Sequence, residues 1–142
     1  MQARIEWQGK VHFKAESGSG HKVLVDGPPD AGGENLGSRP MELVLMGLGG
    51  CTSYDVVTIL AKSRQNVRSC VTELTAERAD STPQVFTHIN IHFIVSGTAL
   101  DPKKVARAVE LSAEKYCSAS IMLERGGVKI THSHAVVEIE AA

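Results

Sequence analysis

The sequence is short of aromatic side chains, of cysteine and of any excess charge, and each shortage excludes a class of protein. Aromatic residues make up 4% of the 142 residues, and 15 Lys and Arg nearly balance 16 Asp and Glu. Nucleic-acid-binding proteins combine a basic surface with stacking aromatics, so no nucleic-acid partner is expected. Three cysteines are too few for a disulfide framework, and their odd number leaves at least one thiol free.

Long hydrophobic runs are also missing. Nothing approaches the roughly 20 uninterrupted apolar residues that cross a membrane, because Glu42, Asp55 and several glycines interrupt the one candidate, residues 40–61. Residues 1–7 alternate like a strand and lack the apolar segment of a signal peptide. We therefore expect a cytoplasmic protein with no membrane partner. Its length suits a single domain over residues 1–142, which can bury about two-thirds of its unfolded surface.

Residues 40–61 predict the helix around which the fold is organised. Polar side chains are few there, and a helix that is apolar nearly all round belongs inside a core. Ser38 is a suitable N-cap, Pro40 suits the first turn, and Lys62 suits the negative end of the helix dipole. Short strands and one further helix are thin cover for such a segment, which favours a homodimer that shares its core.

Three glycines directly before Cys51, at Gly47, Gly49 and Gly50, disturb this helix. Each costs roughly 1 kcal/mol relative to alanine in a helix interior. Either another backbone approaches closely there, or the helix breaks and restarts near Cys51. A restart would place the thiol at a positive helix end, which lowers a cysteine pKa. A buried structural cysteine among small packing residues is the plain alternative.

Alternating apolar residues predict strands on both sides of this helix. They lie at residues 1–25, where three short strands are expected, and at 67–78, 85–95 and 128–139. Asp101 and Pro102 have the N-cap and N1 order of a second helix. Its inward stripe is Val105, Val109, Ser112 and Tyr116. This order indicates an α+β fold, with antiparallel sheets wrapped around a central buried helix.

Cys51 and Cys117 are the candidate reactive residues. Both are expected at ends or breaks of helices, whereas Cys70 lies mid-strand on an apolar face and is expected to be structural. Two such cysteines suit a thiolate nucleophile and a resolving thiol, provided that folding brings their Cα atoms within about 4.4–6.8 Å. Asp55 follows Cys51 by one helical turn and could cap, pair with a cation, or raise the thiol pKa.

The segment from Pro40 to Val57, together with Tyr116-Cys117-Ser-Ala-Ser120, resembles the OsmC/Ohr family of osmotically inducible and organic hydroperoxide resistance proteins. The similarity covers essentially the whole chain. It implies an intertwined homodimer without a cofactor, in which Cys51 reduces an organic hydroperoxide. Cys117 then condenses with the Cys51 sulfenic acid to a disulfide, and an external dithiol restores both thiols.

The sequence departs from the family pattern at the start of the long helix. Family members place a glutamate directly after the proline and pair it with an arginine from the N-terminal strands. Here Met41 follows Pro40, and the acid is Glu42, about 100° further round the helix. Lys14 is expected at the arginine position, where it supplies a charge but no planar fork. Apolar residues expected near Cys51 favour organic peroxides over hydrogen peroxide: Leu43, Leu48 and Val56.

A non-enzymatic dimer is the first alternative, because the departure at Met41 could remove peroxidase competence. Its paired thiols would sense redox state or bind a small apolar ligand. Such a protein would react with peroxide at most once per subunit. In either case Tyr54 or Ser118 could donate a hydrogen bond to the thiolate or the bound ligand.

A zinc protein that uses Cys51, Cys117 and a histidine is the second alternative. Four histidines form two pairs on strand faces: His88, His92, His132 and His134. Ordinary polar positions on half-exposed strands explain these pairs equally well.

Overall fold

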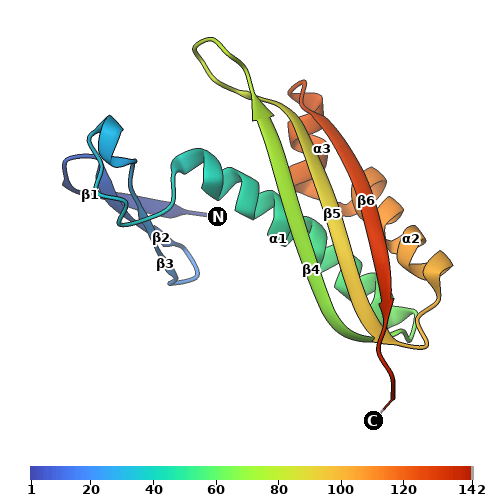
Figure 1. Ribbon diagram of the computed structural model, residues 1–142. Helices are drawn as coiled ribbons and strands as arrows, with labels where there is room; N and C mark the ends of the chain where they lie inside the picture. The colour runs from blue at the N-terminus through green and yellow to red at the C-terminus, as the bar shows by residue number, and fades with distance from the viewer. Residues whose placement is uncertain (142) are drawn as a thin grey trace. The chain divides into compact units, whose positions relative to one another are not determined.

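The computed structural model describes residues 1–141, which form two compact units (Figure 1). The first unit covers Met1–Val44, and the second begins at Leu45. Helix α1 (Pro40–Lys62) starts in the first unit and continues in the second. Sheets and helices alternate in the predicted order, so the α+β class is confirmed. The assignment of the whole chain to one domain stays a prediction.

The first unit is an antiparallel sheet of three strands, as the hairpin pattern predicts. Strands β1 (Ala3–Gly9), β2 (His12–Ser17) and β3 (Lys22–Val25) pair in chain order. The loop after β3 contains a 3-10 turn, η1 (Pro29–Ala31). The buried Asp26 carboxylate organises this loop, because it accepts backbone N–H groups of Gly27, Glu34 and Leu36 at 2.7, 3.1 and 3.0 Å.

Helix α1 begins at Pro40, as predicted, but its cap is not Ser38. Ser38 forms a bridge to β3, and Arg39 immediately precedes the helix. The Glu42 side chain accepts the backbone N–H of Arg39 at 2.9 Å, and the Leu43 N–H donates to the Arg39 carbonyl. This is the return hydrogen bond of a capping box. Glu42 therefore has a structural role in the first turn.

The second unit is a three-stranded sheet with helices on one face (Figure 1). Its strands are β4 (Asn66–Arg78), β5 (Phe86–Thr98) and β6 (Lys129–Glu138). The β4–β5 pair is the predicted antiparallel hairpin, but β6 runs parallel to β5. This corrects the expectation of purely antiparallel sheets. Helices α2 (Pro102–Leu111) and α3 (Ser118–Arg125) form a crossover that returns the chain to the end where β5 began.

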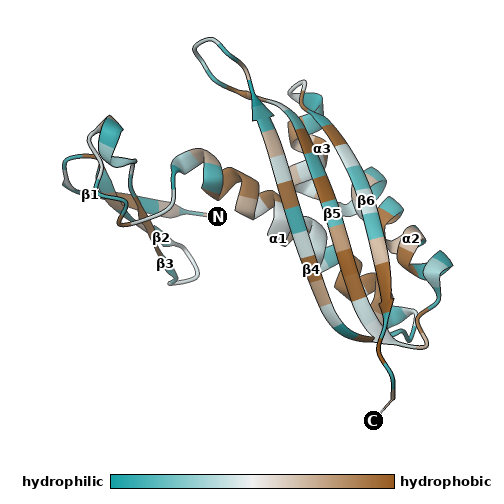
Figure 2. Cartoon of the chain, viewed as in Figure 1, coloured by the Kyte–Doolittle hydropathy of each residue, from teal (hydrophilic) through white to brown (hydrophobic). Residues whose placement is uncertain are grey.

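The core of the second unit lies between this sheet and its helices. Alternate residues of β5 are fully buried: Ile89, Ile91, Phe93 and Val95. Their alternation with polar residues is visible as brown and teal bands along the strands in Figure 2. This part of the predicted strand pattern is confirmed. The predicted pattern at the start of this strand is not confirmed. The register shifts beside Arg78, so Phe86 is buried and Val85 is exposed.

Within the single chain, helix α1 is buried on one stripe only, and the homodimer expected to cover its other side stays a prediction. Leu48, Val56 and Leu60 are buried, whereas Tyr54 and Val57 are exposed. One sheet can cover only one side of a helix, so the opposite apolar side has no cover from residues 1–141 of the same chain. By length and composition α1 could cross a membrane, but its buried stripe is that of a core helix.

Gly49 is the one glycine of this helix with a tight neighbour. An added Cβ would lie 2.8 Å from Leu74 Cδ1, whereas at Gly47 and Gly50 it would meet nothing within 4 Å. The close approach therefore comes from a strand side chain. The alternative of a helix break near Cys51 is wrong, because α1 runs through that residue without interruption.

A double-mutant cycle tests the contact between Gly49 and Leu74. In the wild type, Gly49→Ala forces the Leu74 side chain to move, and overpacking costs about 1–3 kcal/mol, which offsets the gain of about 1 kcal/mol in helix propensity. In the Leu74→Ala background this contact is absent, so the same substitution should raise the free energy of unfolding more than it does in the wild type. Urea unfolding of the four proteins measures the coupling. The same change in both backgrounds would contradict the assigned contact.

Candidate active site

Cys51 lies in the middle of α1, within the second unit. Its side chain is partly exposed, and its Sγ lies 3.9 Å from Ser118 Oγ. Cys51 is thus not at the end or break of a helix, as the glycines had suggested. Any helix terminus that acts on its thiol must belong to another element.

Cys117 lies where the sequence predicts it, at a helix end. Between α2 and α3 the chain makes a π-helical turn, η2 (Ser112–Tyr116), closed by a 2.9 Å hydrogen bond from Cys117 N–H to the Ser112 carbonyl. Cys117 then caps α3, and its sulfur accepts the Ser120 N–H at 3.4 Å. The side chain is fully buried. The wider turn also places Ser112 inside and leaves Tyr116 exposed, so Tyr116 was wrongly assigned to the inward stripe.

The two candidate sulfurs come together in the fold. The Sγ atoms of Cys51 and Cys117 and a carboxylate oxygen of Asp55 all lie within 4.8 Å of one another. Residues separated by 66 positions in the sequence thus share one small cluster. To form a disulfide bond of about 2.05 Å, the two sulfurs would have to move closer together.

The two thiols differ in acidity. Burial raises the pKa of Cys51, but hydrogen bonds from the Ala119 backbone N–H, the Cys117 thiol and the Ser118 hydroxyl outweigh it, so the pKa falls below its ordinary value. Burial and the neighbouring Cys51 sulfur raise the pKa of Cys117 to about 12. Cys51 is therefore the more acidic thiol of the pair. The first turn of α3 supplies the backbone donor that stabilises its thiolate.

A chain of hydroxyl groups orients Asp55. Thr52 Oγ1 lies 2.8 Å from Ser112 Oγ, and the Ser112 hydroxyl donates to Asp55 Oδ2 at 3.1 Å. Both hydroxyl residues are fully buried. The Asp55 charge acts to raise the pKa of both neighbouring thiols. Of the three roles open to Asp55, the structure thus shows a hydrogen-bonded carboxylate beside the sulfurs.

The zinc alternative does not find its ligands here. Within residues 1–141, the one group of three or more close metal-binding side chains contains Cys51, Asp55 and Cys117, and no histidine belongs to it. A closed structural zinc site needs four ligands. Two of the four strand histidines bond to hydroxyl groups: His88 Nε2 lies 3.0 Å from Thr131 Oγ1, and His92 Nδ1 lies 2.7 Å from Ser133 Oγ. The buried Nε2 of His132 has no hydrogen-bond partner among the described residues.

The remaining candidate residues are Cys70, Tyr54, Ser118 and Lys14. Cys70 lies in β4, where burial raises its pKa, as expected for a structural thiol. Tyr54 is exposed, whereas Ser118 contacts the Cys51 sulfur. Lys14 lies in β2 opposite Glu6 of β1, and its expected action on Cys51 stays a prediction.

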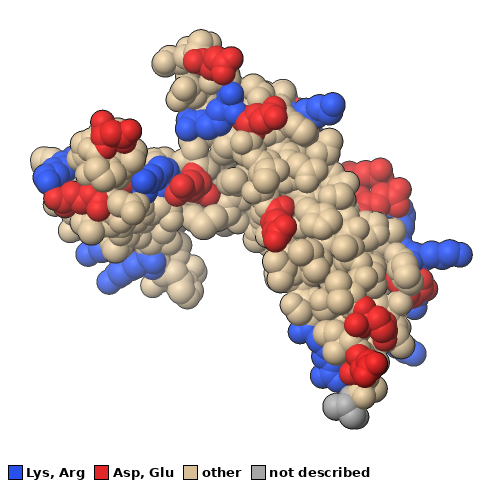
Figure 3. Space-filling view, viewed as in Figure 1, with Lys and Arg blue, Asp and Glu red and all other residues tan. Residues whose placement is uncertain are grey.

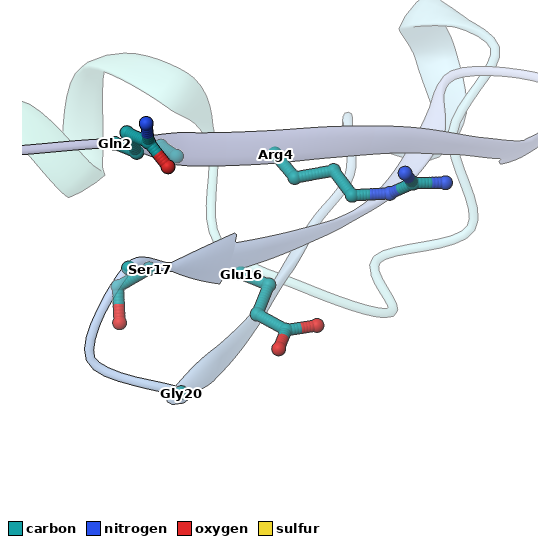
Figure 4. Close-up of a pocket in the computed structure, with 7 residues that line it drawn as sticks. Gln2, Arg4, Glu16, Ser17 and Gly20 are labelled. Carbon is teal, nitrogen blue, oxygen red and sulfur yellow. The ribbon is translucent and has the colours of Figure 1, made fainter.

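Each unit also has a surface hollow, and neither of these two hollows is lined by Cys51 or Cys117. The first unit has one of about 300 Å³, with Arg4 and Glu16 on its wall (Figure 4). The second unit has another of about 300 Å³ beside Cys70, lined by Gly49, Gly50 and Leu74 among others. On the face shown in Figure 3, acidic and basic side chains of the described residues are interspersed. The paired sulfurs are therefore the candidate site.

Known proteins resemble this chain in sequence and in fold. The family model described as OsmC-like protein matches residues 32–133. The chain belongs to this family. OsmC-like relatives include Protein YhfA of Escherichia coli strain K12, 54% identical over 140 residues, which cover 96% of this chain and 98% of that protein.

Solved structures extend the OsmC-like comparison. A hypothetical protein from Aquifex aeolicus VF5 is 29% identical, with a TM-score of 0.85 over 98% of this chain and 97% of its own. An organic hydroperoxide resistance protein from Legionella pneumophila is 19% identical, with a TM-score of 0.71 over 95% and 96% of the two chains. At that identity the likeness supports the fold alone. The OsmC/Ohr fold expected from the sequence is thus confirmed.

The difference in acidity predicts selective alkylation. Reduced protein treated with iodoacetamide near neutral pH should be labelled at Cys51 well before Cys70 or Cys117, because only thiolates react and the Cys51 pKa is lowered. The midpoint of the Cys51 rate against pH should lie below that of an ordinary thiol, while the midpoints of the other two lie above it. Peptide mass spectrometry follows each site.

Ala119→Pro removes the N–H that lowers the Cys51 pKa, in the first turn of α3, where a backbone N–H has no partner within the helix. It should move the Cys51 profile to higher pH, whereas the control Ala119→Ser keeps the N–H and the profile. Equal alkylation of all three cysteines in the wild type would contradict the assigned difference in acidity.

Proposed function

We propose that this protein reduces organic hydroperoxides through its paired cysteines. Membership of the OsmC-like family and similarity in fold to proteins named for organic hydroperoxide resistance support a peroxide-related redox role. The observation that carries the specific proposal is the pair of sulfurs within 4.8 Å, one with a lowered pKa and the other buried and protonated. This is the asymmetry required of a peroxidatic and a resolving thiol.

The reaction has two chemical steps on the protein. The Cys51 thiolate attacks the distal oxygen of the hydroperoxide, the O–O bond breaks, and the alkoxide takes up a proton to leave as an alcohol. Cys51 becomes a sulfenic acid. The Cys117 sulfur then attacks the Cys51 sulfur, the S–O bond breaks, and water and a disulfide form. An external dithiol reduces that disulfide by exchange.

The location follows from this cycle. A disulfide that must be reduced in each turnover needs a compartment that supplies dithiols, and such compartments keep isolated thiols reduced. We therefore place the protein in the cytoplasm.

A turnover assay tests the proposal. Purified protein with excess dithiothreitol should consume many equivalents of cumene hydroperoxide per subunit, and should do so faster than it consumes hydrogen peroxide. Consumption that ends after a single equivalent per subunit would instead support a redox sensor. No consumption at all would overturn the redox proposal.

We also propose a homodimer that covers the exposed side of α1. Met46, Tyr54 and Val57 lie there at 53%, 73% and 42% exposure, and Gly47 and Gly50 leave open space on the helix. Small residues of this kind permit close approach of a second backbone, whereas within the chain they only cost helix stability. An apolar stripe of this length on a soluble protein marks an interaction surface.

Introduction of a charge on that stripe should dissociate the dimer. Val57→Lys is expected to shift the sedimentation mass from two chains to one, because the lysine would be buried without a partner. Glu110→Lys on the exposed face of α2 is the matched control and should remain dimeric. A wild-type mass of a single chain would contradict the proposal.

A further inference from the structure

The resolving step needs a proton acceptor. The Cys117 thiol is buried and its pKa is raised, so almost no thiolate exists at neutral pH. Attack on a sulfenic acid nevertheless requires loss of the thiol proton, and the leaving hydroxide requires a proton to become water. A group that accepts the first proton and returns it would serve both needs.

Asp55 is the group in position to do this. Its carboxylate lies within 4.8 Å of both sulfurs, close enough to reach them through one water molecule or a small side-chain rotation. In residues 1–141 no other carboxylate or histidine belongs to this cluster. The α1 backbone carries Asp55 one turn from Cys51, and the π turn η2 carries the hydroxyl that contacts it.

The hydroxyl chain from Thr52 through Ser112 to Asp55 fixes the direction of this carboxylate. Ser112 donates to Oδ2, so that oxygen is held toward the buried side of α2. A negative charge beside Cys51 raises the pKa of its thiol and so disfavours the thiolate. The first step of the reaction therefore gives no reason for a carboxylate at this position. A role in the second step would offset that disadvantage.

We propose that Asp55 is the proton acceptor of the disulfide-forming step, an inference that rests on the proposed function. The carboxylate takes the Cys117 proton as the sulfur attacks Cys51. The S–O bond of the sulfenic acid breaks, and the proton passes from Asp55 to the departing hydroxide as water forms. Atoms and charge balance without a further reactant, since the hydroperoxide has already supplied the oxidation.

A single-turnover experiment on Asp55→Asn separates the two steps. Reduced protein is mixed with one equivalent of cumene hydroperoxide, and peroxide loss, sulfenic acid trapped by dimedone, and disulfide are followed by mass spectrometry. Disulfide formation should slow by roughly 100-fold or more, because a positioned base usually accelerates a proton transfer by at least this factor. Peroxide loss in the same samples reports the first step separately, so a slower disulfide step is not confused with a change at the Cys51 thiol.

The pH dependence distinguishes a proton acceptor from a packing residue. Wild-type disulfide formation should vary little between pH 6 and 8, whereas in Asp55→Asn it should rise about tenfold per pH unit as solvent hydroxide takes over. Ser112→Ala is the second variant: it keeps the carboxylate but removes its donor, so it should retain the flat profile at a moderately lower rate.

The outcomes separate this inference from the proposed function. Wild-type rate and a flat profile in Asp55→Asn would overturn the role of Asp55 while leaving peroxide reduction intact. A slow rate with a flat profile would mark Asp55 as a packing residue and would also overturn the inference. Failure of the wild type to form a sulfenic acid or consume peroxide would overturn both proposals.

Discussion

Cys51→Ser lowers the turnover of cumene hydroperoxide at least about 1,000-fold, the scale of loss when a covalent nucleophile is removed. The expected loss has two causes. A serine hydroxyl is not ionised by the hydrogen bonds that lower the Cys51 pKa, and its oxygen cannot accept the peroxide oxygen to form a sulfenic acid. Steady-state peroxide consumption with excess dithiol measures the effect.

The control for that variant is another cysteine of the same unit. Cys70 lies in β4 with a raised pKa and is absent from the sulfur cluster, so Cys70→Ser should turn over as the wild type does. Thermal unfolding should show that both variants fold. Activity of Cys51→Ser close to that of the wild type, or loss of activity in Cys70→Ser alone, would contradict the assignment of the peroxidatic thiol.

Cys117→Ser should stop the reaction after the first step. Without the second sulfur, Cys51 remains a sulfenic acid, which dimedone traps and excess peroxide oxidises further to a sulfinic acid. The dimedone adduct at Cys51 should rise more than about tenfold over the wild type, where disulfide formation removes the sulfenic acid. Peptide mass spectrometry after one equivalent of hydroperoxide makes the comparison.

A matched substitution on the same short helix separates this effect from local damage. Ser118→Ala alters the neighbouring residue, whose hydroxyl assists Cys51, and should slow the first step while leaving little sulfenic acid. A dimedone adduct no larger in Cys117→Ser than in the wild type would exclude Cys117 as the resolving residue.

The local elements of the fold follow from short-range signals in the sequence. Pro40 opens α1 and Asp101 with Pro102 opens α2, because N-terminal helix positions have strong residue preferences. The apolar alternation of β5 predicts its buried face for the same kind of reason. The parallel pairing of β6 could not be predicted in this way, because it depends on how the crossover returns the chain.

The sequence indicated the two candidate cysteines and their proposed roles, but not the contacts that set their acidity. Cys51 and Cys117 stand out by their surroundings and by resemblance, and the fold brings their sulfurs together. The glycines before Cys51 suggested that a helix end of its own element acts on the thiol. The helix terminus that lowers the Cys51 pKa is instead that of α3, through the backbone N–H of Ala119. Such a contact joins distant segments and leaves no periodic signal. In the sequence, the one indication of a role for Ser112 is its hydroxyl group on an otherwise apolar helix stripe.

The pairing of Cys51 with Cys117 is tested most directly by one oxidation experiment. Fully reduced wild-type protein is treated with one equivalent of cumene hydroperoxide without added dithiol, digested under acidic conditions, and analysed for cross-linked peptides. The account predicts loss of both thiols for each hydroperoxide reduced, with one disulfide that joins the Cys51 and Cys117 peptides. Consumption of hydroperoxide with both thiols still free, or a disulfide that involves Cys70, would contradict it.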